Sequence, residues 1–98
     1  MNKWIVSGAW CVGNNTKSMN AVFPSVHSSQ EDAVKEMINL VMDDLEGIKF
    51  KVVQDEWGRG FEEYFDEEGN LIATIGPDYA KVDTNDVHGR YLIAEVGF

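Results

Sequence analysis

The stretch SSQEDAVKEMINLVMDDLEGI, residues 28–48, constrains the fold more than any other part of the chain. Ser28 and Glu31 have the spacing of a capping box, in which the two side chains satisfy backbone N–H groups at the start of a helix. Gly47 suits a left-handed C-cap. Between them, apolar residues recur at helical spacing and form one stripe: Val34, Met37, Ile38, Val41 and Leu45. The pattern predicts one amphipathic helix at about residues 29–46, with its stripe in the core.

The rest of the sequence has the patterns of strands and turns. A strand is expected at residues 3–12, where Gly8 permits a close approach or a bulge. Its partner is expected at residues 19–27, where Pro24 indicates an edge strand or a bulge. Five further strands are expected after the helix, at residues 48–54, 61–65, 71–75, 79–83 and 90–96. In 48–54, Ile48, Phe50 and Val52 form the face expected to be half-buried.

These elements predict an α+β fold in a single domain covering residues 1–98. Because the connections between successive strands are short, the strands are expected to pair antiparallel. The expected architecture is one curved antiparallel sheet of about five to seven strands, in the order ββα followed by β-hairpins. The helix packs on one face of the sheet.

Charge and cysteine content restrict the classes of partner and compartment. The chain has 17 acidic and 8 basic residues, a net charge of −9. Such a field repels phosphate backbones and anionic membranes, so no direct nucleic-acid or membrane binding is expected, whereas a basic partner is attracted. Solubility alone is the alternative explanation of the charge. The single cysteine, the lack of a secretory leader and the lack of a long apolar run favour a cytoplasmic protein.

Motifs for catalysis, metals and cofactors are missing from the sequence. Cys11, His27 and His88 do not have zinc-ligand spacing, and neither histidine stands in a recognisable pattern with the cysteine. The segment 66–70 begins like a calcium loop but has its glycine at the wrong position. The glycines of WGRGF match no nucleotide-binding fingerprint. We therefore expect a protein that is not an enzyme, with no catalytic residue, no metal and no cofactor.

The segment DEWGRGFEEYFDEEGN, residues 55–70, is the feature that rises above background. It concentrates carboxylates beside aromatic rings, and the last turn of the expected helix adds three more acids, which oppose the helix dipole. A local rule broken without structural gain is typical either of a functional surface or of accident. The candidate partner-binding residues are Asp43, Asp44, Glu46, Asp55, Glu56, Trp57, Glu62, Tyr64, Asp66, Glu67 and Glu68.

Alternation within FEEYFD predicts how part of this surface is built. Phe61, Glu63 and Phe65 share one face of the strand, and the two phenylalanines are expected to point into the core. The other face would then present carboxylate, ring and carboxylate, from Glu62 through Tyr64 to Asp66. Guanidinium groups pair with carboxylates and stack on rings, so such a ridge suits an arginine-rich protein surface.

We therefore interpret the chain as an acidic binding protein that occupies a basic protein surface, with nucleic-acid-handling enzymes as one class of partner. Small acidic inhibitors encoded by phages and mobile elements, anti-CRISPR proteins among them, are similar in class, which is an analogy and no family match. The alternative is a structural or homo-oligomeric domain with no ligand, in which Trp4, Trp10 or Tyr91 forms an exposed apolar patch. A third hypothesis is a small-ligand site or enzyme, near His27 or Arg90.

Overall fold

The computed structural model describes residues 2–12, 20–54 and 60–97, and these form one sheet and one helix. The strand–strand–helix order followed by hairpins agrees with the prediction. The elements are β1 (Asn2–Val12), β2 (Asn20–His27), α1 (Gln30–Asp44), β3 (Phe50–Gln54), β4 (Glu62–Asp66), β5 (Leu71–Ile75), β6 (Tyr79–Asp83) and β7 (Val87–Gly97).

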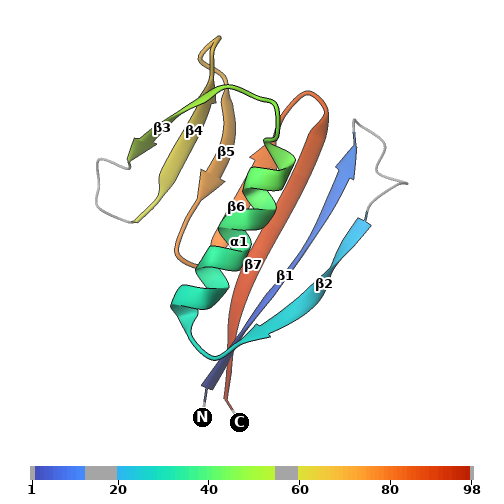
Figure 1. The fold of residues 1–98 in the computed structure, drawn as a ribbon, viewed down its shortest axis with the longest axis vertical. Coiled ribbons are helices and arrows are strands. Elements are labelled where there is room, and N and C mark those ends of the chain that lie inside the picture. Colours follow the sequence, from blue (N-terminus) through green and yellow to red (C-terminus); the bar gives the residue numbers. More distant parts are fainter. Residues whose placement is uncertain (1, 13–19, 55–59, 98) are drawn as a thin grey trace.

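The seven described strands lie in the order β2-β1-β7-β6-β5-β4-β3, and every neighbouring pair is antiparallel. The first and last strands, β1 and β7, pair along their full length from Asn2↔Gly97 to Val12↔Val87 (Figure 1). The predicted α+β class with one antiparallel sheet is therefore confirmed. β2 lies at one edge, as Pro24 indicated, and β3 lies at the other.

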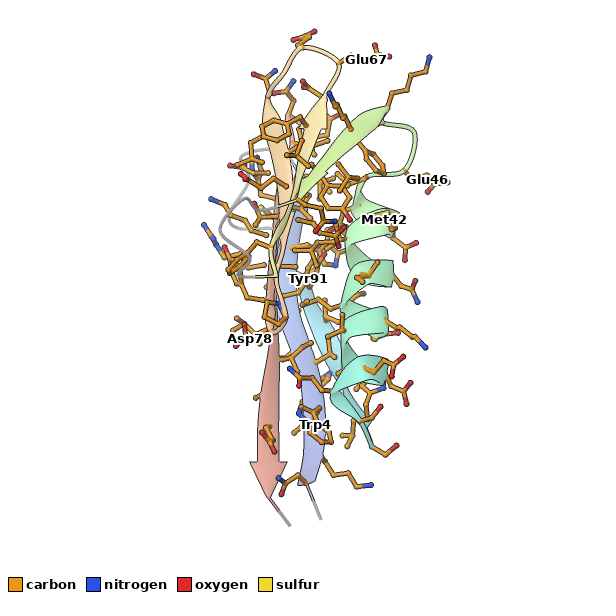
Figure 2. The ribbon with its side chains drawn as sticks, turned by 90° about the vertical axis from the view of Figure 1, so that its left-hand side faces the viewer. Trp4, Met42, Glu46, Glu67, Asp78 and Tyr91 are labelled. Atoms are coloured by element: carbon orange, nitrogen blue, oxygen red, sulfur yellow. The ribbon has the colours of Figure 1, made fainter. Side chains whose placement is uncertain are left out.

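The core lies between α1 and the middle of the sheet. Met37 and Val41 are fully buried on the helix, and they belong to one apolar cluster with Val6 of β1, Tyr91 of β7 and Val82 of β6. The helix packs against β1, β7, β6 and β2. Figure 2 shows it on one side of the sheet, and no described helix or strand covers the other side. We call that other side the open face.

The helix boundaries differ slightly from the prediction. The N-cap is Ser29 rather than Ser28, and its Oγ accepts a hydrogen bond of 3.2 Å from the backbone N–H of Asp32. Leu45 is the C-cap, and Gly47 follows with a φ of 80°, the left-handed conformation expected of it. Two adjacent serines satisfy the capping pattern nearly equally well, so the local sequence alone left the start of the helix uncertain by one residue.

The interpretation of β3 as half-buried is wrong. Phe50 and Val52 remain 39% and 41% exposed, and all five residues of the strand are exposed. β3 is the edge strand farthest from β2, and the helix does not extend over it. Ile48, just before the strand, still packs against the core.

Gly8 lies where two neighbouring strands meet closely. A Cβ at this position would overlap the backbone oxygen of Arg90 and would lie 2.5 Å from Cδ1 of Tyr91. The β1–β2 register also shifts between Val6 and Gly8, so the expected close approach and the expected bulge are both present.

Replacement Gly8→Ala should lower the free energy of unfolding by about 1–3 kcal/mol, because it overpacks the Tyr91 ring. Urea denaturation measures the change. Gly97→Ala is the matched control in β7: its Cβ would meet nothing closer than Oδ1 of Asn2 at 3.6 Å. Equal stability of the two variants would contradict the packing derived for Gly8.

Candidate functional site

Exposed carboxylates gather where three connections meet at one end of the molecule. The turn between β4 and β5 lines a shared surface hollow with residues 47–49, which follow the helix, and Asp66 lines a second hollow with the β6–β7 turn. Figure 2 shows Glu46 and Glu67 at this end. We call it the acidic end; its members are Asp43, Glu46, Asp66, Glu67, Glu68 and Asp86.

The acidic end is only weakly neutralised within the described residues. Lys49 Nζ lies 4.0 Å from Glu67 Oε1, and both side chains are largely exposed. A pair of this kind contributes little because water and salt screen it. Asp43, Glu46 and Glu68 have no side-chain ion pair among the described residues. Most of the negative charge at this end therefore remains available to a partner.

Asp66 shapes the turn that carries Glu67 and Glu68. Its Oδ1 accepts hydrogen bonds from the backbone N–H groups of Glu68 at 2.9 Å and of Asn70 at 2.8 Å. Oδ2 accepts one from the Asn70 side chain at 3.1 Å. These hydrogen bonds, led by that of the Asn70 backbone, favour the ionised form and lower the pKa of Asp66. The turn thus holds two neighbouring glutamates in a defined position.

Asp44 is half-buried and bonds to the sheet, whereas its neighbour Asp43 is exposed. The hydroxyl of Tyr91 on β7 donates a hydrogen bond to Asp44 Oδ2, and the two side chains join the end of the helix to the sheet. Gly89 lies beside this contact, because a Cβ there would come within 3.0 Å of the Tyr91 hydroxyl oxygen. Burial raises the pKa of Asp44, and the charge of Asp43 acts in the same direction.

The predicted ridge on β4 is wrong in its orientation. Tyr64 is only 5% exposed, belongs to the core cluster and contacts the Phe50 ring at 5.3 Å between centroids. Phe65 therefore faces the opposite way, onto the open face, and Phe61 precedes the strand and lies against Gly76. Glu62 shares the Tyr64 side of the strand, where its carboxylate accepts a hydrogen bond of 3.0 Å from Gln54 on β3.

Some of the remaining predicted residues lie outside the described part of the chain, and others lie away from the acidic end. Asp55, Glu56 and Trp57 lie outside the described residues. Tyr91 is buried, so it does not form the exposed apolar patch considered for an oligomer. Sequence reasoning missed Asp86, which the β6–β7 turn brings to the acidic end. The signal for it was the TNDVHG turn, but its proximity to the helix end follows only from sheet order.

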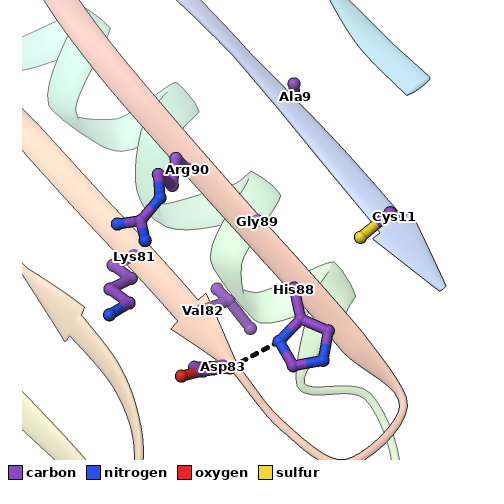
Figure 3. Close-up of a pocket in the computed structure, with 8 residues that line it drawn as sticks. All are labelled: Ala9, Cys11, Lys81, Val82, Asp83, His88, Gly89 and Arg90. Carbon is purple, nitrogen blue, oxygen red and sulfur yellow. Dashed lines mark hydrogen bonds and ion pairs between the residues drawn. The ribbon is translucent and has the colours of Figure 1, made fainter. Parts of the chain in front are cut away.

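The open face has a different chemical character. Lys81 of β6 and Arg90 of β7 are register partners on this face (Figure 3). They line a pocket of about 180 Å³ with small residues of β1, where Ala9 is the register partner of Arg90. Apolar side chains flank this centre: Leu92 is 53% exposed and Val26 is 61% exposed.

A thiol, an imidazole and a carboxylate that line this pocket lie in one cross-strand row. Cys11 of β1 is the register partner of His88, and His88 is the register partner of Asp83. His88 Nδ1 and Asp83 Oδ1 share a hydrogen bond, drawn in Figure 3. This order of groups is the one in which a cysteine nucleophile is activated. Cys11, however, is 4% exposed, which leaves its sulfur poorly placed for a substrate.

The described residues contain no group of His, Cys, Asp and Glu side chains arranged to hold a metal ion. The single helix among them is too short and too polar to cross a lipid bilayer. No protein-family model, no curated protein and no solved structure matches this chain. Function therefore has to be argued from the two surfaces described above.

Asp44→Asn should stabilise the protein at pH 7 and have little effect near pH 3. Because the folded-state pKa of Asp44 is raised above its usual 3.8, the folded state binds more protons than the unfolded state just above that pH. Wild-type stability therefore falls, relative to Asp44→Asn, as pH rises from about 3.8 through the raised value. Urea denaturation across pH 3–7 measures this. The exposed Asp78→Asn serves as control, and a stability difference independent of pH would contradict the role of burial.

Proposed function

We propose that this protein is a non-enzymatic binding protein whose acidic end docks on a basic surface of another protein. The observation that carries the proposal is that carboxylates of the β4–β5 and β6–β7 turns line adjoining hollows, with Glu46 after the helix at the same end of the molecule (Figure 2). These side chains come from three separate parts of the sequence. Surfaces that bind nucleic-acid phosphates are basic, and so the proposed partner class is a nucleic-acid-handling enzyme.

Two features support binding over mere solubility. Asp66 holds the turn that presents Glu67 and Glu68, so these side chains start from an ordered backbone and lose less entropy on binding. The last turn of α1 contains no basic residue, and the charge of Asp43 in that turn opposes the helix dipole. Such a carboxylate costs roughly 0.3–1 kcal/mol at low salt. A surface kept acidic at a cost in stability fits a role in recognition.

Charge reversal tests the proposal. The double variant Glu67→Lys/Glu68→Lys should lose at least about tenfold in affinity for a captured basic partner at low salt, because like charges then face each other. The control Glu36→Lys/Asp78→Lys changes the net charge equally but lies away from the acidic end. Partners are captured from extract of the native host, purified and measured by calorimetry at low and high salt.

Added nucleic acid should compete with the wild-type protein for the same partner. Partner affinity that is equal in the two double variants would refute the acidic end as the binding surface. Binding that does not weaken with salt would refute its electrostatic basis.

A homo-oligomer formed through the open face is the second candidate function. The exposed apolar side chains there support it, among them Leu92, Val26, Leu71 and Val53. Apolar surface of this kind is typical of protein–protein contacts when it is contiguous. Of the residues expected to form such a patch, Trp4, Trp10 or Tyr91, only Tyr91 is buried, while Trp4 and Trp10 are half-buried.

Sedimentation equilibrium at high micromolar concentration tests this second candidate. Self-association should appear as a mass above 11.0 kDa, and Leu92→Lys should reduce it because a desolvated charge opposes burial. Val12→Lys is the control, since Val12 is also exposed but shares a strand face with Gly8 and Trp10 on the helix side. A wild-type mass of one chain at all concentrations would exclude the candidate.

A further inference from the structure

We propose that the open face contains a binding site for a small oxyanion, a carboxylate or phosphate group, held between Lys81 and Arg90. The site lies on the open face and shares no residue with the acidic end, so it is independent of the function proposed above. Its ligand class follows from the charge, the fork geometry of the arginine and the size of the adjacent pocket.

The first observation is an uncompensated pair of cations. Lys81 and Arg90 are directly opposite each other in the β6–β7 register. Side chains so placed have Cβ atoms about 4.5–5.5 Å apart, and like charges there are destabilising. Among the described residues neither has an ion pair, although Lys35 and Lys49 each lie near a glutamate. Although the sequence has a net charge of −9, no acidic side chain of the described residues forms an ion pair with either cation.

The nearest carboxylate on this face is already engaged. Asp83 follows Lys81 by two residues on the same face of β6, but its Oδ1 is bonded to His88 Nδ1 (Figure 3). Asp83 forms no ion pair with Lys81 or Arg90, so both cations remain available to an oxyanion from solution.

The second observation is the space beside the two cations. The pocket of about 180 Å³ is lined by both of them and by Ala9, Cys11, Val82, Asp83, His88 and Gly89. The hollow exists because the side chain opposite Arg90 on β1 is small: Ala9 is its register partner. Drug-sized ligands occupy pockets of about 300–1,000 Å³, so this one fits only a small molecule or a single group of a larger one.

The chemistry of the lining fits an oxyanion. A guanidinium donates two parallel hydrogen bonds to a carboxylate or phosphate, and the ammonium of Lys81 adds a point charge. On β5, Thr74 is the register partner of Lys81 and lines the neighbouring hollow with it, which adds a hydroxyl donor on the same face. Negative charge elsewhere on the protein is screened over about 8 Å at physiological ionic strength.

Titration followed by NMR of ¹⁵N-labelled protein tests the site, with sodium phosphate and sodium acetate in separate arms at ionic strength held constant with sodium chloride. Saturable shifts are expected for backbone amides near residues 81 and 90. Lys81→Gln and Arg90→Gln should each weaken binding at least about tenfold. Lys3→Gln is the matched control, because Lys3 also lies on the open face and is the register partner of Val96, far from the pocket.

Thermal melting gives a second readout on the same variants. Lys81→Gln and Arg90→Gln should melt at or above the wild-type temperature without phosphate, because each removes a like-charge contact. Phosphate or acetate should then raise Tm in the wild type and in Lys3→Gln only. The arm with the tighter saturation identifies the preferred oxyanion. Equal dissociation constants in all variants, or shifts that do not saturate in either arm, would overturn the proposal.

Discussion

Among the described residues, a single helix covers a sheet of seven strands, and the rest of the structure depends on this mismatch in width. Strands spaced about 4.8 Å apart make such a sheet roughly 29 Å wide, whereas a helix with its side chains is about 10–12 Å wide. The apolar stripe of α1 lies over β1, β7 and β6, where Met37 and Val41 meet Val6, Val82 and Tyr91. The described residues of β3 are therefore exposed, and so are several side chains of the open face, Leu92 and Val26 among them.

The two surfaces also differ in charge. Carboxylates gather at the chain connections of the acidic end, while the open face carries Lys81 and Arg90 together with Asp83 and small residues. Asp44 differs from the acids of both surfaces because it lies between the helix end and the sheet. It accepts a hydrogen bond from the Tyr91 hydroxyl, and its partial burial raises its pKa. One aspartate thus serves packing, while its neighbour Asp43 remains exposed.

Local patterns were a good guide wherever the decisive interactions are local. The helical stripe, the left-handed conformation of Gly47 and the edge position indicated by Pro24 agree with the structure. The alternation in β4 correctly predicts a strand, but the predicted buried face is wrong, because Tyr64 and not Phe65 faces the helix side. The β4–β5 register shifts after Tyr64, which pairs with Ala73, whereas Phe65 pairs with Leu71. Phenylalanine is more apolar than tyrosine, yet Tyr64 lies on the helix side.

The sequence by itself determined the element order, the α+β class, the position of the helix and the negative charge, because periodicity, turn residues and composition act over a few neighbouring residues. Only the tertiary structure decided which face of each strand is buried, which carboxylates lie close together and that Lys81 and Arg90 are register partners. Those outcomes depend on strand order and register, which place residues distant in the sequence side by side. A shift of one residue in register moves a side chain to the opposite face of the sheet.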